Sequence, residues 1–324
     1  MIISKTPLRL CLGGGSTDLP AYSNENGGFV VTSALNRHVY LLVKNRFEKE
    51  LKINYSTVEI VEDVSGIKHP VVREALKLLG LKDHIEVISS ADVPAETGLG
   101  SSGSFTVGLI HALHGLKDEY LSRLDLAKES TNLIMNILKE PCGCQDTYIA
   151  SFGGFVCLDI LKNGNVIVTQ LHLKYPIIRE LENNLLFFYT GIKRSANIVL
   201  KDQSKHMDKN LESMHEIKHI GHKVKHALET GNLTEFGLLQ HSHWMIKRLT
   251  SSEITNDRID KLYDTGIKAG AIGGKLMGAG GGGFLVLYCE NHKDNVRKAM
   301  AKEGLQEIHF RFEDEGSKLI INIR

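Results

Sequence analysis

Residues 93–105 read VPAETGLGSSGSF, in which Gly98, Gly100 and Gly103 spell G-x-G-x-x-G. The residues before this stretch, HIEVISSA, are typical of a strand. After it, apolar residues recur at the spacing of one helix face, at Phe105, Leu109, Leu113 and Leu116. The stretch is therefore expected to form a loop that joins a strand to a helix.

This glycine pattern has three interpretations. A dinucleotide-binding turn would open the first βα unit and precede an acidic residue by about 20 residues, but here it lies near residue 100 and helices follow it. A phosphate-binding loop suits the junction better, because a helix start leaves backbone N–H groups unpaired and glycine lets phosphate approach them. It is not a Walker A loop, since no lysine follows the last glycine. A simple helix cap is the third interpretation.

Two further glycine-dense segments favour phosphate binding. They are LGGGSTDLP at 12–20 and MGAGGGGF at 277–284, and together they hold 8 of the 31 glycines. Because glycine loses much backbone freedom on folding, dense runs usually mark a close approach of the backbone to a ligand or to another segment. Three such loops in one chain predict a ligand that is rich in phosphate.

The overall composition excludes several classes of partner. The 324 residues are 42% hydrophobic and 24% charged, and 39 Lys and Arg balance 38 Asp and Glu. No strong net charge therefore favours nucleic acid or a membrane surface. No apolar run reaches the roughly 20 residues of a membrane span, and the first residues lack a signal-peptide pattern. Five cysteines, an odd number, favour reduced thiols and hence a cytoplasmic protein.

The strand and helix patterns predict an α+β protein of two domains. The first third is rich in strand signals, and a helix is expected over 122–139 before a pair of strands in GGFVCLDI and NVIVTQLHL. The second half is more helical, with helices over 195–230, 232–249, 256–269 and 292–303, the first two separated by Gly231, and two strands at the end. We place the domain boundary near residue 175, which gives domains 1–175 and 176–324.

Three motifs give the chain a resemblance to the GHMP kinases, the superfamily of galactokinase, homoserine kinase, mevalonate kinase and phosphomevalonate kinase. PLRLCLGGGSTD resembles the first motif, PAETGLGSSGS the second and KLMGAGGGGF the third, in the right order. The second is the most specific, since residues 94–102 match P-x-x-x-G-L-G-S-S throughout. Longer segments, including EPCGCQDTYIASFGGF and HWMIKRLTSSEITNDRIDKLY, are most similar to the D-glycero-D-manno-heptose 7-phosphate kinases of bacterial polysaccharide biosynthesis.

The resemblance implies a two-domain GHMP kinase architecture, with a mixed-sheet amino-terminal domain, a ferredoxin-like, helix-rich carboxy-terminal domain, and ATP between them. It implies that the second loop wraps the triphosphate, with Ser102 as a Mg²⁺ ligand. The nucleotide-binding candidates are Pro94, Gly98, Leu99, Gly100, Ser101, Ser102, Gly103 and Ser104. The third loop is expected to pack against the second, as support or in contact with ligand, through Gly278, Gly280, Gly281 and Gly282.

Asp146 lies where superfamily members carry the catalytic aspartate, and a carboxylate there can accept the proton of an attacking hydroxyl. Taken alone, it would be interpreted as a cap or turn residue. Arg9 has the spacing of the first motif and would stabilise Asp146 as a carboxylate or neutralise phosphoryl charge; taken alone, it is an exposed edge-strand arginine. The first loop would bind sugar hydroxyls through Gly15, Ser16, Thr17 and Asp18.

An acceptor that already carries a phosphate needs a second cationic site. Lys193 and Arg194 precede the helix expected from Ser195, and Lys247 in HWMIKR is a further candidate. Taken singly, each is more often a solvated surface cation.

The chain departs from the heptose kinase pattern at two places. Cys144 stands in GCQDTY where a lysine is usual, which removes a charge expected near the phosphates. Ile134 lies near the place of a magnesium-binding glutamate, so the acidic ligand is either Glu129 or replaced by Ser102, ATP and water. A zinc site at Cys142 and Cys144 is not favoured, and the histidines of the 195–230 helix are better interpreted as a solvated basic stripe.

These observations predict a kinase that transfers the γ-phosphoryl group of MgATP to the anomeric hydroxyl of D-glycero-D-manno-heptose 7-phosphate. The alternatives are another GHMP sugar kinase for a hexose or an unphosphorylated heptose, a catalytically silent nucleotide-binding relative, and a NAD-dependent dehydrogenase. The expected partners are a small sugar phosphate and neither nucleic acid nor membrane, and a homodimer is one candidate assembly.

Overall fold

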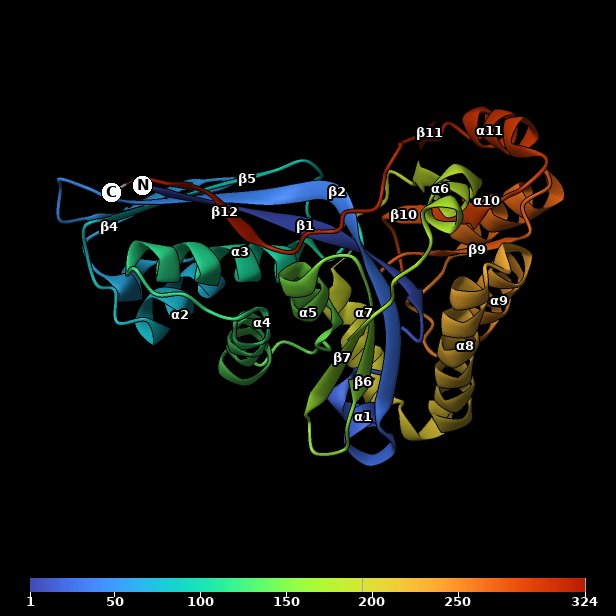
Figure 1. Cartoon of the computed structure of the whole chain (residues 1–324), viewed down its shortest axis with the longest axis horizontal. Coiled ribbons are helices and arrows are strands. Elements are labelled where there is room, and N and C mark those ends of the chain that lie inside the picture. The colour runs from blue at the N-terminus through green and yellow to red at the C-terminus, as the bar shows by residue number, and fades with distance from the viewer. Residues whose placement is uncertain (194, 324) are drawn as a thin grey trace.

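The computed structural model describes residues 1–193 and 195–323. Figure 1 shows a long sheet with helices beneath it, and a smaller sheet with its own helices at the opposite end of the molecule. The two chain ends lie together at the far end of the long sheet, because the last strand pairs with the first.

The larger sheet is mixed, as predicted. Its strand order is β12-β1-β2-β5-β3-β4, with β6 paired to β2 and β7 to β6, and every pair is antiparallel except β3 with β5. The long strand β2 pairs with β6 through its first part and with β5 through its second. The bounds are β1 Ile2–Gly13, β2 Gly28–Asn45, β3 Leu51–Asn54, β4 Val58–Val61, β5 Ile85–Ala91, β6 Phe155–Ile160, β7 Val166–Gln170 and β12 Lys318–Asn322.

Helices α2 to α5 lie beneath this sheet (Figure 1). The helix α3 packs against both β1 and β2, because its apolar face, with Leu109, Ile110 and Leu113, is fully buried in the core. The helix expected over 122–139 is α4 followed by a π-helical turn, Asn132–Ile137. The bounds are α1 Pro20–Asn26, α2 Pro70–Leu78, α3 Ser101–Leu116, α4 Arg123–Thr131 and α5 Gln145–Phe152.

The smaller sheet is antiparallel and has the order β11-β8-β10-β9. Along the chain, β8 is followed by helices, then by β9 and β10, then by α11 and finally by β11. This is the ferredoxin-like β-α-β-β-α-β arrangement, so the predicted fold class is confirmed. The strand bounds are β8 Leu185–Tyr189, β9 Gly273–Leu276, β10 Phe284–Tyr288 and β11 Gln306–Glu307. The helix bounds are α6 Tyr175–Asn184, α7 Ala196–Lys205, α8 Leu211–Thr230, α9 Leu233–Lys247, α10 Asp257–Lys268 and α11 Lys293–Lys302.

Two features differ from the sequence-based expectation. The helix predicted over 195–230 is broken between α7 and α8, where Met207 turns into a buried cluster with Tyr22 and Met214. Packing across the chain thus overrides local helical periodicity.

The last strand, β12, joins the larger sheet, so the chain returns to its first domain. The boundary near residue 175 stays a prediction. Gly231 does end α8, in a left-handed conformation.

No helix in the described residues is long and apolar enough to span a bilayer.

Candidate active site

All three glycine-rich loops meet at one cavity of about 490 Å³, whose walls come from both halves of the chain. The predicted site residues that line it are Arg9, Gly15, Ser16, Asp18, Gly98, Gly100, Ser101, Ser102, Gly103, Asp146, Lys247 and Gly278. Predicted residues that do not line it are Pro94, Leu99, Ser104, Thr17, Gly280, Gly281, Gly282, Lys193 and Glu129. Arg194 lies outside the described residues.

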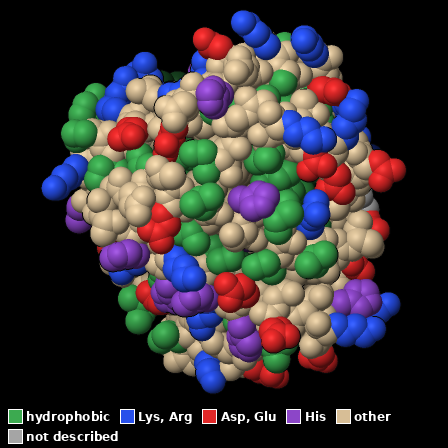
Figure 2. All heavy atoms as spheres, turned by 90° about the vertical axis from the view of Figure 1, so that its right-hand side faces the viewer, with side chains coloured by type: hydrophobic (Ala, Val, Ile, Leu, Met, Phe, Trp, Pro, Cys, Tyr) green, Lys and Arg blue, Asp and Glu red, His purple; other side chains and the backbone are tan. Residues whose placement is uncertain are grey.

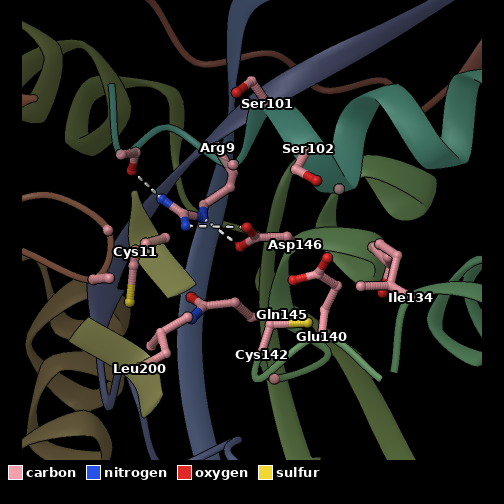
Figure 3. Close-up of a pocket in the computed structure, with 18 of the residues that line it drawn as sticks. Arg9, Cys11, Ser101, Ser102, Ile134, Glu140, Cys142, Gln145, Asp146 and Leu200 are labelled. Carbon is pink, nitrogen blue, oxygen red and sulfur yellow. Dashed lines mark hydrogen bonds and ion pairs between the residues drawn. The ribbon is translucent and has the colours of Figure 1, made fainter. Parts of the chain in front are cut away.

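Arg9 and Asp146 form a two-point ion pair at the centre of this cavity (Figure 3). The Arg9 Nε lies 2.7 Å from Asp146 Oδ1, and Nη2 lies 3.2 Å from Oδ2. The third arm of the guanidinium, Nη1, donates to the Gly98 carbonyl at 2.5 Å. Burial opposes the charge on Arg9, but the Asp146 carboxylate outweighs it and raises the arginine pKa. Arg9 is therefore a buried side chain in the sheet interior, and the exposed edge-strand interpretation is wrong.

The second loop leads directly into α3, as its strand–loop–helix pattern predicts. Gly100 takes the N-cap position in a left-handed conformation and supplies no side-chain cap. The first N–H groups of α3 therefore lie at the cavity wall with the positive end of the helix dipole. Figure 3 shows Ser102 pointing to the side where Asp146 and Glu140 lie, whereas Ser101 points the other way.

The third loop packs directly on the second. A methyl group at Gly278 would lie 2.6 Å from the Gly98 Cα, and one at Gly283 would lie 2.2 Å from the Thr97 carbonyl. Gly278 also lines the cavity, so this loop both supports the second loop and contributes to the wall. The remaining predicted glycines contact Ile254 and Ile192 instead: Gly280, Gly281 and Gly282.

The predicted residues behind the wall have structural contacts. The Thr17 hydroxyl donates to the carbonyls of Gly14 and Phe29, which fixes the first loop. The Ser104 hydroxyl donates to the Pro7 carbonyl, and Leu99 is fully buried in the core. Their side chains hold the loops in place and do not line the cavity.

Asp18 lies next to the helix that carries Asp146. Its Oδ2 accepts a hydrogen bond from the Gln145 backbone N–H at 3.0 Å, and Gly143 leaves room for it, since a methyl group there would lie 2.0 Å from Oδ2. Burial raises the pKa of Asp18 to about 6, and the negative charge of Asp146 adds to this effect. The first loop thus orients the start of α5 as well as lining the cavity.

We expect Asp18→Asn to weaken the pH dependence of stability. The folded-state pKa of Asp18, about 6, exceeds its unfolded value, so its stabilising contribution is complete below the unfolded pKa and is lost as the pH rises through 6. Ionised Asp18 then lowers the free energy of unfolding by up to about 3 kcal/mol. Urea unfolding at about pH 5 and about pH 8 measures roughly half of this change, because the contribution is complete only below the unfolded pKa. Parallel pH profiles for the two proteins would contradict it.

Four residues that line the cavity were not predicted from the sequence: Glu140, Gln145, His243 and Lys275. Glu140 stands six residues before Asp146, in KEPCGCQD, and its carboxylate accepts from the Asn197 side chain at 2.5 Å. His243 precedes Lys247 by four residues, which places both on one face of α9. Lys275 lies on β9 just before the third loop. Their positions in the sequence could have identified them. Glu140 and Gln145 lie in the segment that contains Asp146, His243 lies one helical turn from Lys247, and Lys275 adjoins the third glycine loop.

Glu129 does not reach the cavity. Its carboxylate faces the ring of His114, with both oxygens 3.1 Å from Nε2, while Ile134 does line the cavity. Cys144 is buried in an apolar cluster with Tyr148 and does not line the cavity, so its substitution for lysine changes the core and not the cavity wall. This corrects the expectation that position 144 faces the phosphates.

The candidate zinc ligands are Cys142, Cys144 and the histidines on the helix predicted over 195–230. The described residues contain no group of three or more His, Cys, Asp or Glu side chains placed to hold a metal. On α8, His215 contacts the Tyr22 hydroxyl and His222 stacks on Phe29. Figure 2, which looks onto the side of α8 to α11, shows histidines scattered among cationic and acidic side chains.

Comparison with known proteins identifies the family. Residues 67–154 match the GHMP kinases N-terminal domain and residues 224–306 match the GHMP kinases C-terminal domain. The chain is 30% identical to the D-glycero-alpha-D-manno-heptose 7-phosphate kinase of Campylobacter jejuni over 98% of both proteins. It is 26% identical to the galactokinase of Pyrococcus furiosus, covering 96% of this chain and 95% of that enzyme.

The fold is also that of a solved kinase structure. The crystal structure of a D-glycero-D-manno-heptose 1-phosphate kinase from Bacteroides thetaiotaomicron superimposes with a TM-score of 0.84 at 24% identity, over 100% of both chains. The larger sheet is mixed and not doubly wound, and the family uses ATP, so the dinucleotide interpretation of the second loop is wrong. The chain belongs to the GHMP kinase family and is a sugar kinase, an ATP-dependent phosphotransferase with an alcohol group as acceptor.

Proposed function

We propose that this kinase transfers the γ-phosphoryl group of ATP to the anomeric hydroxyl of D-glycero-D-manno-heptose 7-phosphate, which yields the 1,7-bisphosphate. The observation that carries the proposal is the Asp146 carboxylate, held by Arg9 in the same cavity as the start of α3. The similarity to a heptose 7-phosphate kinase over nearly the whole chain supports the choice of sugar. The free thiols of all five cysteines agree with a cytoplasmic location.

The reaction needs an in-line attack and stabilisation of charge more than a strong base. The anomeric hydroxyl attacks the γ-phosphorus, the bond to the β–γ bridging oxygen breaks, and ADP leaves with its electron pair. Asp146 accepts the hydroxyl proton, and the two bonds from Arg9 hold its carboxylate in position in the cavity. The N–H groups at the start of α3 hold the phosphates of ATP, with Ser102 at the same wall.

The cavity also offers oxygen ligands for Mg²⁺. The Ser102 hydroxyl and the Glu140 carboxylate both line it, and Mg²⁺ prefers such oxygen ligands together with phosphate and water. Held there by Ser102 and Glu140, the ion would neutralise negative charge on the phosphates of ATP. We therefore assign the acidic ligand to Glu140 in place of Glu129.

Glu140→Gln is expected to raise the Mg²⁺ concentration needed for half-maximal activity by about 10-fold or more, because a carboxylate ligand is lost. Activity titrated with Mg²⁺ at fixed ATP measures this. Glu129→Gln is the matched control: it removes the same charge from the pair with His114 and should leave the Mg²⁺ requirement unchanged. An effect of Glu129→Gln equal to that of Glu140→Gln would refute the assignment.

ADP release with MgATP across a panel of sugars tests the substrate. Turnover of heptose 7-phosphate with little turnover of hexoses or unphosphorylated heptose supports the proposal. Turnover only of an unphosphorylated sugar would refute it and favour another GHMP sugar kinase. Binding of ATP without turnover of any sugar would point to a silent relative.

A further inference from the structure

On the side of the cavity formed by α9 and β9, the wall includes three basic side chains. His243 and Lys247 lie on α9, and Lys275 lies on β9. We propose that Lys247, Lys275 and His243 bind the phosphate group that the acceptor sugar already carries, and so select a phosphorylated acceptor. This inference rests on the proposed function and specifies its substrate class.

The three side chains are deeply buried and connected to the glycine loops. They are 5%, 2% and 1% exposed for Lys247, Lys275 and His243 respectively. The Lys247 Nζ donates to the Gly278 carbonyl at 2.5 Å, and the Lys275 Nζ donates to the Leu12 carbonyl at 3.1 Å. The cluster therefore lies between the start of the first loop and the start of the third.

The hydrogen-bond pattern of the cluster leaves donors in excess. The His243 Nδ1 lies 3.0 Å from the Lys275 Nζ, and an ammonium group can only donate, so Nδ1 accepts and the ring proton sits on Nε2. Nε2 is buried and has no hydrogen-bond partner in the described part of the chain. The cluster thus presents three donor groups, two ammonium groups and one ring N–H, which suit phosphate oxygens.

The charge of the cluster is also uncompensated. Within the described residues, neither lysine has a carboxylate at ion-pair distance. Burial, together with the positive charge of Arg9, lowers the pKa of each to about 8. Among the other ionisable groups, Cys11 acts on both lysines, Asp18 acts on Lys247, and Lys247 acts on Lys275. Burying unpaired cations is unfavourable, and a dianionic phosphate relieves this cost on binding.

The position of the cluster favours the acceptor over ATP. The triphosphate is expected at the N–H groups of α3, beyond the Arg9–Asp146 pair. Lys275 instead contacts Leu12, next to the loop of Ser16 and Asp18 that lines the cavity. The acceptor phosphate would then lie between the first glycine loop and the third.

Lys247→Met and Lys275→Met test the inference, with the exposed Lys223→Met on α8 as the matched control. Each of the first two is expected to raise the KM for the phosphorylated acceptor by about 10- to 100-fold, since a buried charge-assisted contact is lost. The KM for ATP should stay within about twofold, because phosphate contacts in ATP are unchanged. The KM for the unphosphorylated form of the same sugar should not rise, and Lys223→Met should match the wild type.

Three outcomes would overturn the phosphate site: equal loss with both forms of the acceptor, a rise in the KM for ATP alone, or no change in any KM. Should the variants fail to fold, as judged by their melting temperatures, the wild type supplies a second test. Inorganic phosphate should then inhibit competitively against the acceptor and not against ATP; inhibition competitive only with ATP refutes the site.

The experiment separates this inference from the proposed substrate. Turnover of heptose 7-phosphate with an unchanged KM in both lysine variants refutes the phosphate site and keeps the substrate. Turnover of a different phosphorylated sugar, with a KM that depends on both lysines, refutes the substrate and supports the phosphate site.

Discussion

Asp146→Asn is expected to lower kcat by about 10²- to 10⁴-fold while the dissociation constant for ATP stays nearly unchanged. The amide has almost the same shape as the carboxylate but cannot accept the proton of the attacking hydroxyl. It also removes the negative partner of Arg9, whose Nε and Nη2 both bond to this carboxylate. Single-turnover ADP formation, with ATP binding measured by calorimetry, separates the two effects.

Asp125→Asn is the matched control for this variant. Asp125 also lies in the first turn of a helix, α4, but it does not line the cavity. Its kcat should equal that of the wild type. If Asp146→Asn instead weakened ATP binding as much as it lowered kcat, Asp146 would act by holding the second loop through Arg9, which also bonds to Gly98, and not as a base.

The sequence allowed the local parts of the site to be predicted because each depends on short-range chemistry. The strand–loop–helix junction around Gly100 follows from apolar spacing and glycine content, and it forms as expected. The shared composition of the three glycine loops predicted a phosphate-rich ligand, whereas the packing of the third loop on the second, seen where Gly278 meets Gly98, was expected from the resemblance. The pairing of Arg9 with Asp146, 137 residues apart, came only from the resemblance to the GHMP kinases.

Features that depend on distant parts of the chain could not be predicted in this way. Glu129 is the nearest acid upstream of Ile134 in the sequence, but α4 directs it to His114, while Glu140 reaches the cavity after the π-helical turn. The pairing of β12 with β1 joins the two ends of the chain, and no local pattern encodes it. Cys144 faces the core because it precedes α5, whose buried face packs there.

Gly103→Ala is expected to lower kcat/KM by about 10²-fold, because it displaces the phosphate-binding helix from the base. Gly103 lies in the first turn of α3, and a methyl group there would lie 2.5 Å from the Asp146 Cβ and 3.1 Å from its backbone carbonyl carbon. Alanine favours a helix over glycine by about 1 kcal/mol. The overpacking cost of about 1–3 kcal/mol opposes this gain, since backbone atoms of α5 cannot move aside easily.

Gly115→Ala, the same substitution near the other end of α3, isolates this effect from helix propensity. Its added methyl group would meet the Cδ1 of Leu319 at 2.7 Å, the end of a flexible side chain that can rotate away. We therefore expect Gly115→Ala to keep wild-type turnover and a melting temperature at least as high. Gly103→Ala should lose activity even where it remains folded, because Asp146 and the start of α3 must keep a fixed spacing for in-line transfer. Equal behaviour of the two variants would show that the close contact between α3 and α5 does not set that spacing.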